Sequence, residues 1–225
     1  MQKNLLNNIK LVLFDLDGTL VDTAPDFLFS LNEVLRKNKY DQVFLEDIRS
    51  HISDGSGMLT KVGFGINEVD ANFEKYKREL LDVYKKNLTR SSKLFSDIKE
   101  LITQIKILGI DYGIVTNKPY EYASPLINHF KEFKECKILI CPDHLTKAKP
   151  SPEGILLACS KLDIEPKHAC YVGDHIVDID AALAADIPIV SCSYGYGDLP
   201  EKTNTNELRI DNPRSLIECL KNKDV

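Results

Sequence analysis

Polar side chains that could act on a ligand follow three short apolar segments of this sequence. They are Asp15 and Asp17 after residues 10–14, Thr116 and Asn117 after 112–115, and Asp174 and Asp178 after 170–172. Lys149 lies in a Pro-bounded loop before a predicted helix. Ligands of open parallel sheets bind at the carboxyl ends of the strands. If the three segments are parallel strands, these groups converge at one edge.

The three acids Asp15, Asp174 and Asp178 predict a metal site. Unpaired like charges that share a cleft are costly, so we expect a cation between them. A site made of carboxylate oxygens favours Mg²⁺, which keeps part of its water shell and accepts a phosphate oxygen of a substrate. Together with Lys149, the metal would offset the charge of a phosphoryl group and stabilise its transfer.

The pair of acids at the first strand end suits a covalent reaction at phosphorus. One carboxylate could attack phosphorus and form an aspartyl-phosphate. The other, two residues away on the same side of an extended segment, could protonate the leaving oxygen and later deprotonate water. The Thr116 hydroxyl and nearby backbone N–H groups could hold the remaining phosphate oxygens.

Each of these motifs has an ordinary structural explanation when it occurs alone. Asp-x-Asp-Gly is often a turn or part of a calcium loop, and Thr116-Asn117 after a strand could only cap a helix. Lys149 could be a solvated lysine and Asp174 a turn residue. Their occurrence together, in order and at strand ends, favours a catalytic site.

The elements that would position these groups alternate regularly from Ser96 onward. Apolar segments typical of strands alternate with amphipathic helical patterns, which predicts an α/β protein with a Rossmann-like parallel sheet and helices on both faces. The predicted helices cover about 98–108, 121–130, 152–162, 176–185 and 213–220, and the later strands cover 138–141, 187–192 and 208–210.

A charged, strand-poor helical block interrupts this alternation after the first strand. Helices are predicted at about 25–38, 45–52 and 68–84, with a Gly-rich loop at 53–57. We interpret residues 21–91 as an inserted α-helical cap domain, and residues 1–20 and 92–225 as the catalytic core. Closure of the cap should exclude water from the reaction, with Asp54 and Ser56 facing the substrate.

Composition and charge narrow the class of protein. The 225 residues are 43% hydrophobic and carry a net charge of −5, with no cluster of basic residues that would indicate a nucleic-acid partner. No apolar run is long enough for a signal peptide or a membrane span. The six cysteines form no C-x-x-C pair, which disfavours structural zinc and favours reduced thiols in a cytoplasmic protein.

Four ordered motifs resemble those of the haloacid dehalogenase-like superfamily. They are Phe14-Asp15-Leu16-Asp17-Gly18-Thr19, Thr116-Asn117-Lys118, Lys149-Pro150-Ser151-Pro152, and Gly173-Asp174 with Asp178. The resemblance covers essentially the whole chain. It implies a Rossmann-like core with a movable cap inserted after the first motif.

The resemblance also implies roles for the matching residues. Asp15 would be the nucleophile and a magnesium ligand, and Asp17 the general acid and base, with its backbone carbonyl on the metal. Thr116, Asn117 and Lys149 would bind phosphate, while Asp174 and Asp178 would hold Mg²⁺. His175 departs from the Ser or Thr common at its position, and either touches the site or is an exposed loop residue.

Within the superfamily, the sequence favours a phosphatase. Dehalogenases lack an acid at the position of Asp17. Sugar phosphomutases usually carry an Arg in the cap loop, which here spans residues 51–58 and contains no Arg. The chain is similar to phosphatases of 2-phosphoglycolate and of N-acetylmuramic acid 6-phosphate. A sugar phosphomutase and a non-catalytic binding module are the alternatives, and the oligomeric state is open between monomer and homodimer.

Overall fold

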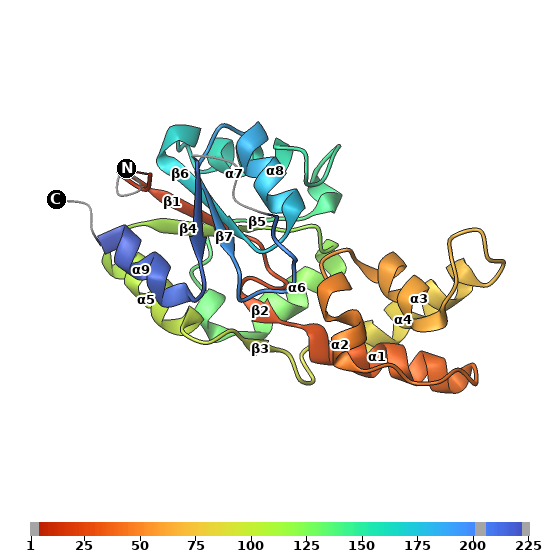
Figure 1. Cartoon of the computed structure of the whole chain (residues 1–225). Helices are drawn as coiled ribbons and strands as arrows, with labels where there is room; N and C mark the ends of the chain where they lie inside the picture. The colour runs from red at the N-terminus through yellow and green to blue at the C-terminus, as the bar shows by residue number, and fades with distance from the viewer. Residues whose placement is uncertain (1–4, 201–205, 222–225) are drawn as a thin grey trace.

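A parallel sheet forms the centre of the computed structural model, which describes residues 5–200 and 206–221 (Figure 1). Among these residues the sheet has six strands in the order β5-β4-β1-β6-β7-β8. The strands are β1 (Leu11–Phe14), β4 (Asp111–Val115), β5 (Leu139–Ile140), β6 (Ala169–Gly173), β7 (Ile189–Cys192) and β8 (Glu207–Ile210). Every residue of the central strand β1 is buried because helices cover both faces of the sheet.

Helices cover the two faces of the sheet in separate layers. One layer holds α5 (Ile98–Ile107), α6 (Tyr120–His129) and α9 (Pro213–Lys221), and the other holds α7 (Glu153–Lys161) and α8 (Ile176–Ala184). Each layer encloses its own apolar cluster against alternate side chains of the strands, with Val12 and Phe14 on one face and Leu11 and Leu13 on the other. This three-layer arrangement confirms the predicted Rossmann-like α/β core.

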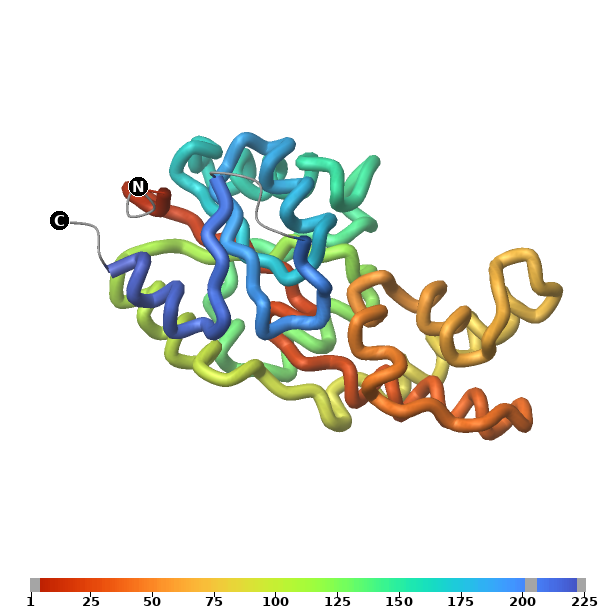
Figure 2. The backbone as a smooth tube through the Cα atoms, in the orientation of Figure 1, coloured from red at the N-terminus to blue at the C-terminus, as the bar shows by residue number. Residues whose placement is uncertain are grey.

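Four helices lie together beside the sheet rather than on either of its faces (Figure 2). They are α1 (Ala24–Lys37), α2 (Leu45–Ile48), α3 (Ser56–Phe64) and α4 (Phe73–Asn87). They enclose a third apolar cluster, in which Leu31, Leu59 and Leu80 are fully buried. A short antiparallel pair, β2 (Val21–Asp22) with β3 (Lys93–Leu94), connects these helices to the core at both ends.

The structure corrects several predicted boundaries in this helical block. The helix predicted at 68–84 begins at Phe73, because Asn67 and Asp70 accept hydrogen bonds from backbone N–H groups two residues ahead and hold turns there. The helix predicted at 45–52 is the short α2 followed by a 3₁₀ turn at Arg49–His51. Helix α3 begins inside the predicted loop 53–57, and its N-cap is Gly55 at φ +87°.

Further 3₁₀ turns lie at Lys131–Phe133, Pro142–His144 and Pro166–His168. The limits predicted for the two domains, 1–20 with 92–225 and 21–91, stay a prediction. Parts of the predicted core, residues 1–4, 201–205 and 222–225, lie outside the described residues.

Membrane spans and thiols can be addressed within the described chain. None of its helices is both long and apolar enough to cross a bilayer. All six cysteines lie in the described residues and are free thiols, and Cys141, Cys159, Cys170 and Cys192 are buried.

Candidate active site

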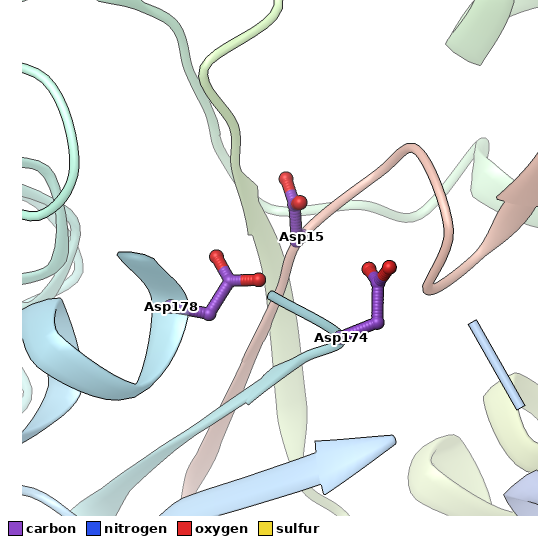
Figure 3. A group of neighbouring side chains, drawn as sticks. All are labelled: Asp15, Asp174 and Asp178. Atoms are coloured by element: carbon purple, nitrogen blue, oxygen red, sulfur yellow. The ribbon is translucent and has the colours of Figure 1, made fainter. Parts of the chain in front are cut away.

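Three carboxylates meet at the carboxyl edge of the sheet (Figure 3). Asp15 follows β1, Asp174 follows the neighbouring strand β6, and Asp178 lies in the first turn of α8. One carboxylate oxygen from each lies within 4.8 Å of the others. The pairing of β1 with β6 brings them together, because Phe14, the last residue of β1, is in register with Val172, one residue before the end of β6.

Burial and repulsion by its neighbours disfavour the charge of Asp174. Asp174 is fully buried, and burial, followed by the negative charges of Asp178 and Asp15, raises the pKa of Asp174 to about 8. Tyr196 N–H and the Thr19 hydroxyl donate to its two oxygens at 2.9 and 2.8 Å and oppose this rise in pKa. Such an electrostatic environment favours a bound cation.

The residues present fit a hard divalent cation. All three side chains offer carboxylate oxygens, the ligands that Mg²⁺ prefers. Asp15 Oδ1 is buried and accepts no hydrogen bond of acceptable angle from the described residues, although Lys149 Nζ lies 2.9 Å away. A Cβ added to Gly18 would lie 2.2 Å from Asp174 Oδ2, so only glycine leaves this carboxylate its place.

Lys149 supplies the positive charge of the cluster. Its ammonium lies 2.9 Å from Asp15 Oδ1 and 2.6 Å from Asp178 Oδ1, and it donates to the Tyr171 hydroxyl at 2.9 Å. Burial alone lowers the pKa of Lys149, but the charges of Asp15 and Asp178 outweigh it and raise that pKa above its usual range. The charged form of Lys149 is therefore favoured beside Asp15.

Asp17 lies apart from the three-carboxylate cluster. The Thr23 hydroxyl donates to its Oδ1 at 2.5 Å, and Lys118 Nζ lies 3.1 Å from each of its oxygens. Its side chain is 13% exposed, against 9% for Asp15, and both residues line the same cleft. This separation leaves Asp17 free for a different task from that of the cluster.

The second motif serves both the cleft and the Lys149 loop. Thr116 directly follows β4 and lines the cleft, and its hydroxyl accepts a hydrogen bond from Lys118 N at 3.2 Å. The side-chain amide of Asn117 forms two hydrogen bonds of 3.0 Å with the backbone of Lys149. Asn117 thus fixes the loop that carries Lys149, while its predicted contact with phosphate stays a prediction.

The cleft has a volume of about 320 Å³ and lies between the core and the four helices. Ser53 to Ser56 line it at the N-terminal end of α3, and the predicted contact of Asp54 and Ser56 with a substrate stays a prediction. Asp54 also lies 3.3 Å from His175 Nε2 and 3.2 Å from His51 Nδ1. The side chain of His175 is only 15% exposed, so of the two alternatives for this residue the structure favours a place at the site.

Sequence reasoning missed several residues of the cleft. Three such residues line the cleft, namely Lys118, Tyr84 and Phe27. Phe27 lies on α1 and Tyr84 on α4, and no separate role was predicted for Lys118. The position of Lys118 directly after Thr116-Asn117 was the available signal. No spacing could have placed Tyr84, because its approach to the core depends on how α4 packs.

Comparison with known proteins gives a consistent picture. A family model described as haloacid dehalogenase-like hydrolase matches residues 12–192. N-acetylmuramic acid 6-phosphate phosphatase of Pseudomonas aeruginosa is 34% identical over 94% of this chain and 95% of its own length. Phosphoglycolate phosphatase of Xanthomonas campestris pv. campestris is 33% identical over 92% of this chain and 94% of its own.

A solved structure agrees with these relatives in fold. The crystal structure of a predicted phosphoglycolate phosphatase from Haemophilus somnus superimposes with a TM-score of 0.84 at 27% identity. The match covers 95% of this chain and 98% of that one. The similarity therefore extends over the sheet and the helical block alike.

Proposed function

The chain belongs to the haloacid dehalogenase-like hydrolase family, and from this premise we propose that it is a magnesium-dependent phosphatase acting on a small phosphomonoester. The observation that carries the proposal is the position of Asp15. Its carboxylate lies at a strand end beside Lys149, within a cluster of acids that fits a divalent cation, and it lines the cleft.

Asp15 is the nucleophile of the proposed reaction. A carboxylate oxygen of Asp15 forms a bond to phosphorus, and the bond between phosphorus and the ester oxygen breaks. The bonding electrons leave with the ester oxygen, which takes a proton from Asp17. Lys149 and Thr116 hold the phosphoryl oxygens, and Asn117 keeps the Lys149 loop in place.

The second half of the reaction restores the enzyme. A water oxygen attacks phosphorus and gives one proton to Asp17, and the bond between phosphorus and Asp15 breaks. Mg²⁺ held by Asp15, Asp174 and Asp178, with the backbone carbonyl of Asp17, would supply positive charge beside the transferred group. The products are inorganic phosphate, the alcohol, and Asp15 and Asp17 in their starting states.

Residues 21–91 act in this proposal as a cap over the cleft. Helices α1, α3 and α4 contribute cleft residues, and Lys85 of α4 forms a 2.6 Å ion pair with Glu121 at the start of α6. A closed cap keeps bulk water from the aspartyl-phosphate until the leaving group has departed. Opening of the cap then lets the products leave.

Two substrates are proposed, 2-phosphoglycolate and N-acetylmuramic acid 6-phosphate. The names of the curated relatives support both. The alternative of a sugar phosphomutase is not favoured by Arg49, which lies over the Tyr196 ring at 4.9 Å and is not among the described residues that line the cleft.

Phosphate release from a panel of monoesters tests the proposed activity. The panel contains 2-phosphoglycolate, N-acetylmuramic acid 6-phosphate, glucose 1-phosphate and a nucleoside monophosphate, each with Mg²⁺ and with EDTA. We expect Mg²⁺-dependent release that is fastest for one of the first two compounds. An isomerised sugar phosphate as product would identify a mutase, and no release from any compound would contradict the phosphatase proposal.

Substitution of the nucleophile tests the covalent step. We expect Asp15→Asn to lower kcat by at least about 10³-fold, because an amide is a far weaker nucleophile than a carboxylate. The matched control is Asp180→Asn, which changes an exposed acid on α8 and should leave kcat unchanged. Circular dichroism checks that both variants fold, and substantial activity in folded Asp15→Asn would contradict the aspartyl-phosphate.

A further inference from the structure

Lys118 is a buried lysine that lines the active-site cleft. Its side chain is 5% exposed, and its Nζ lies 3.1 Å from both oxygens of Asp17. It also donates to the Tyr84 hydroxyl at 2.8 Å. An ammonium carries three N–H donors. When one of them is shared between the two Asp17 oxygens and another is given to Tyr84, the third is left for a ligand.

The surroundings of Lys118 restrict where an anion can bind in the cleft. Among the described residues that line it, Lys118 is the only Lys or Arg. The acids of the lining are Asp15, Asp17, Asp54 and Glu121, and they repel an anionic group elsewhere in the cleft. A second negative group of a substrate, besides its phosphate, therefore has one strongly favourable partner.

The aromatic rings around Lys118 make this partner a fixed one. Its Nζ lies 4.9 Å from the ring centroid of Phe27 and 4.8 Å from that of Tyr84. The two rings are stacked on each other, with centroids 3.8 Å apart. Cation–π contact and low exposure hold the ammonium in place and strengthen its attraction for a carboxylate.

Lys118 is also close to the position that the ester oxygen of a substrate occupies. A general acid must approach the oxygen that it protonates to about 3 Å. Because Lys118 Nζ is 3.1 Å from the Asp17 oxygens, it lies within about 6 Å of the ester oxygen. A group on the alcohol part of the substrate, rather than on its phosphate, can reach Lys118.

We propose that Lys118 determines specificity by binding a carboxylate on the alcohol part of the substrate. The proposal rests on the proposed phosphatase function and narrows its substrates to phosphomonoesters of hydroxy acids. In 2-phosphoglycolate the carboxylate is attached to the carbon that carries the phosphate ester. In N-acetylmuramic acid 6-phosphate it lies on the lactyl group, across the sugar ring from the phosphate. Both compounds offer the same chemistry from different distances.

Two pairs of substrates that differ in the carboxylate test the proposal. The first pair is 2-phosphoglycolate and ethyl phosphate, and the second is N-acetylmuramic acid 6-phosphate and N-acetylglucosamine 6-phosphate. In the unchanged enzyme, kcat/KM should favour the acid by at least about tenfold in one pair, as expected for a hydrogen bond between two charged groups. The pair that shows the preference identifies the source of the carboxylate.

Substitution of Lys118 then separates recognition from a structural role. Lys118→Met should reduce the ratio of kcat/KM within that pair to less than about threefold, because the compound without a carboxylate does not use the charge of Lys118. Lys118→Gln keeps a donor for Asp17 but no charge and should lose the preference in the same way. Lys86→Met, on the exposed side of α4, is the control and should keep the ratio.

The outcomes distinguish this inference from the proposed function. If the unchanged enzyme shows no preference in either pair, or if both Lys118 variants slow the two members equally, Lys118 does not bind the carboxylate and the inference is wrong. Absence of phosphate release from every compound by the unchanged enzyme would instead contradict the phosphatase proposal. Loss of preference in either folded variant supports the inference even if the other variant does not fold.

Discussion

At the active site, the charges of individual residues do not balance without a cation. Lys149 offers one positive charge to Asp15 and Asp178. Asp174 lies in the same cluster, and within the described chain its donors are the Thr19 hydroxyl and a backbone N–H. When all three acids are ionised, two negative charges remain uncompensated in a buried place. A divalent cation offsets that excess, and its binding should therefore stabilise the folded protein.

Thermal unfolding measures this stabilisation. We expect Mg²⁺ at about 100 times its dissociation constant to add about 2.7 kcal/mol, which raises Tm by about 5–10 °C in a chain of this size. Asp174→Asn removes one ligand and should reduce the rise to less than about 2 °C. Asp180→Asn, which alters an exposed acid nearby, should keep the full rise. Equal rises in both variants would contradict a metal site at Asp174.

The turn between β1 and β2 closely constrains the acid cluster. Gly18 has φ +84°, and a Cβ at this residue would overlap the carboxylate of Asp174. Gly65 has a similar φ of +63°, but no atom of the described chain lies within 4 Å of its added Cβ. Alanine at either position strains the backbone, whereas only alanine at 18 displaces an acid of the cluster.

Gly18→Ala and Gly65→Ala therefore form a matched pair. Each should lose about 1 kcal/mol of stability from the left-handed backbone conformation. Only Gly18→Ala should raise the Mg²⁺ concentration for half-maximal phosphatase activity, by about tenfold or more, because Asp174 must move. Titration of activity with Mg²⁺ measures this difference. The same half-maximal concentration in both variants would show that the turn does not position Asp174.

The elements of the core were predictable from the sequence because burial leaves a clear signal. Strands β1 and β6 are apolar throughout, and the polar residues that follow them mark the edge where the site forms. The β2–β3 pair and the start of α3 were not predictable. Two-residue strands are too short to show an alternating pattern. The N-cap of α3 is Gly55, and a glycine at that place predicts a loop rather than the start of a helix.

The same contrast holds for the site. The order of the motifs was enough to predict that Asp15, Asp174 and Asp178 converge, since β1 and β6 are neighbouring parallel strands. The contact of Lys118 with Tyr84 depends instead on how a distant helix packs against the core. Side-chain partners between the helical block and the core are therefore the part of the site that only a structure supplies.

For the molecule as a whole, buried thiols make stability depend on alkaline pH. Burial raises the pKa of Cys170 to about 12, and it raises the pKa of Cys141 to about 12 and of Cys136 and Cys159 to about 11. In the unfolded chain these thiols have their ordinary pKa of about 9. Above pH 9 the unfolded state loses protons that the folded state keeps, so the free energy of unfolding falls as pH rises.

Cys170→Ala tests this dependence at one fully buried thiol on β6. The variant should lose about 1 kcal/mol at pH 7 through the small cavity that it leaves. Between pH 7 and about pH 10.5, the free energy of unfolding of the unchanged protein should fall by up to about 2 kcal/mol more than that of the variant. The reason is that the Cys170 thiol ionises in the unfolded chain and stays protonated in the folded protein. Urea unfolding with EDTA and a reducing agent measures both, which separates the effect from metal binding and thiol oxidation. Parallel pH profiles for the two proteins would mean that the Cys170 thiol ionises as readily in the folded protein as in the unfolded chain.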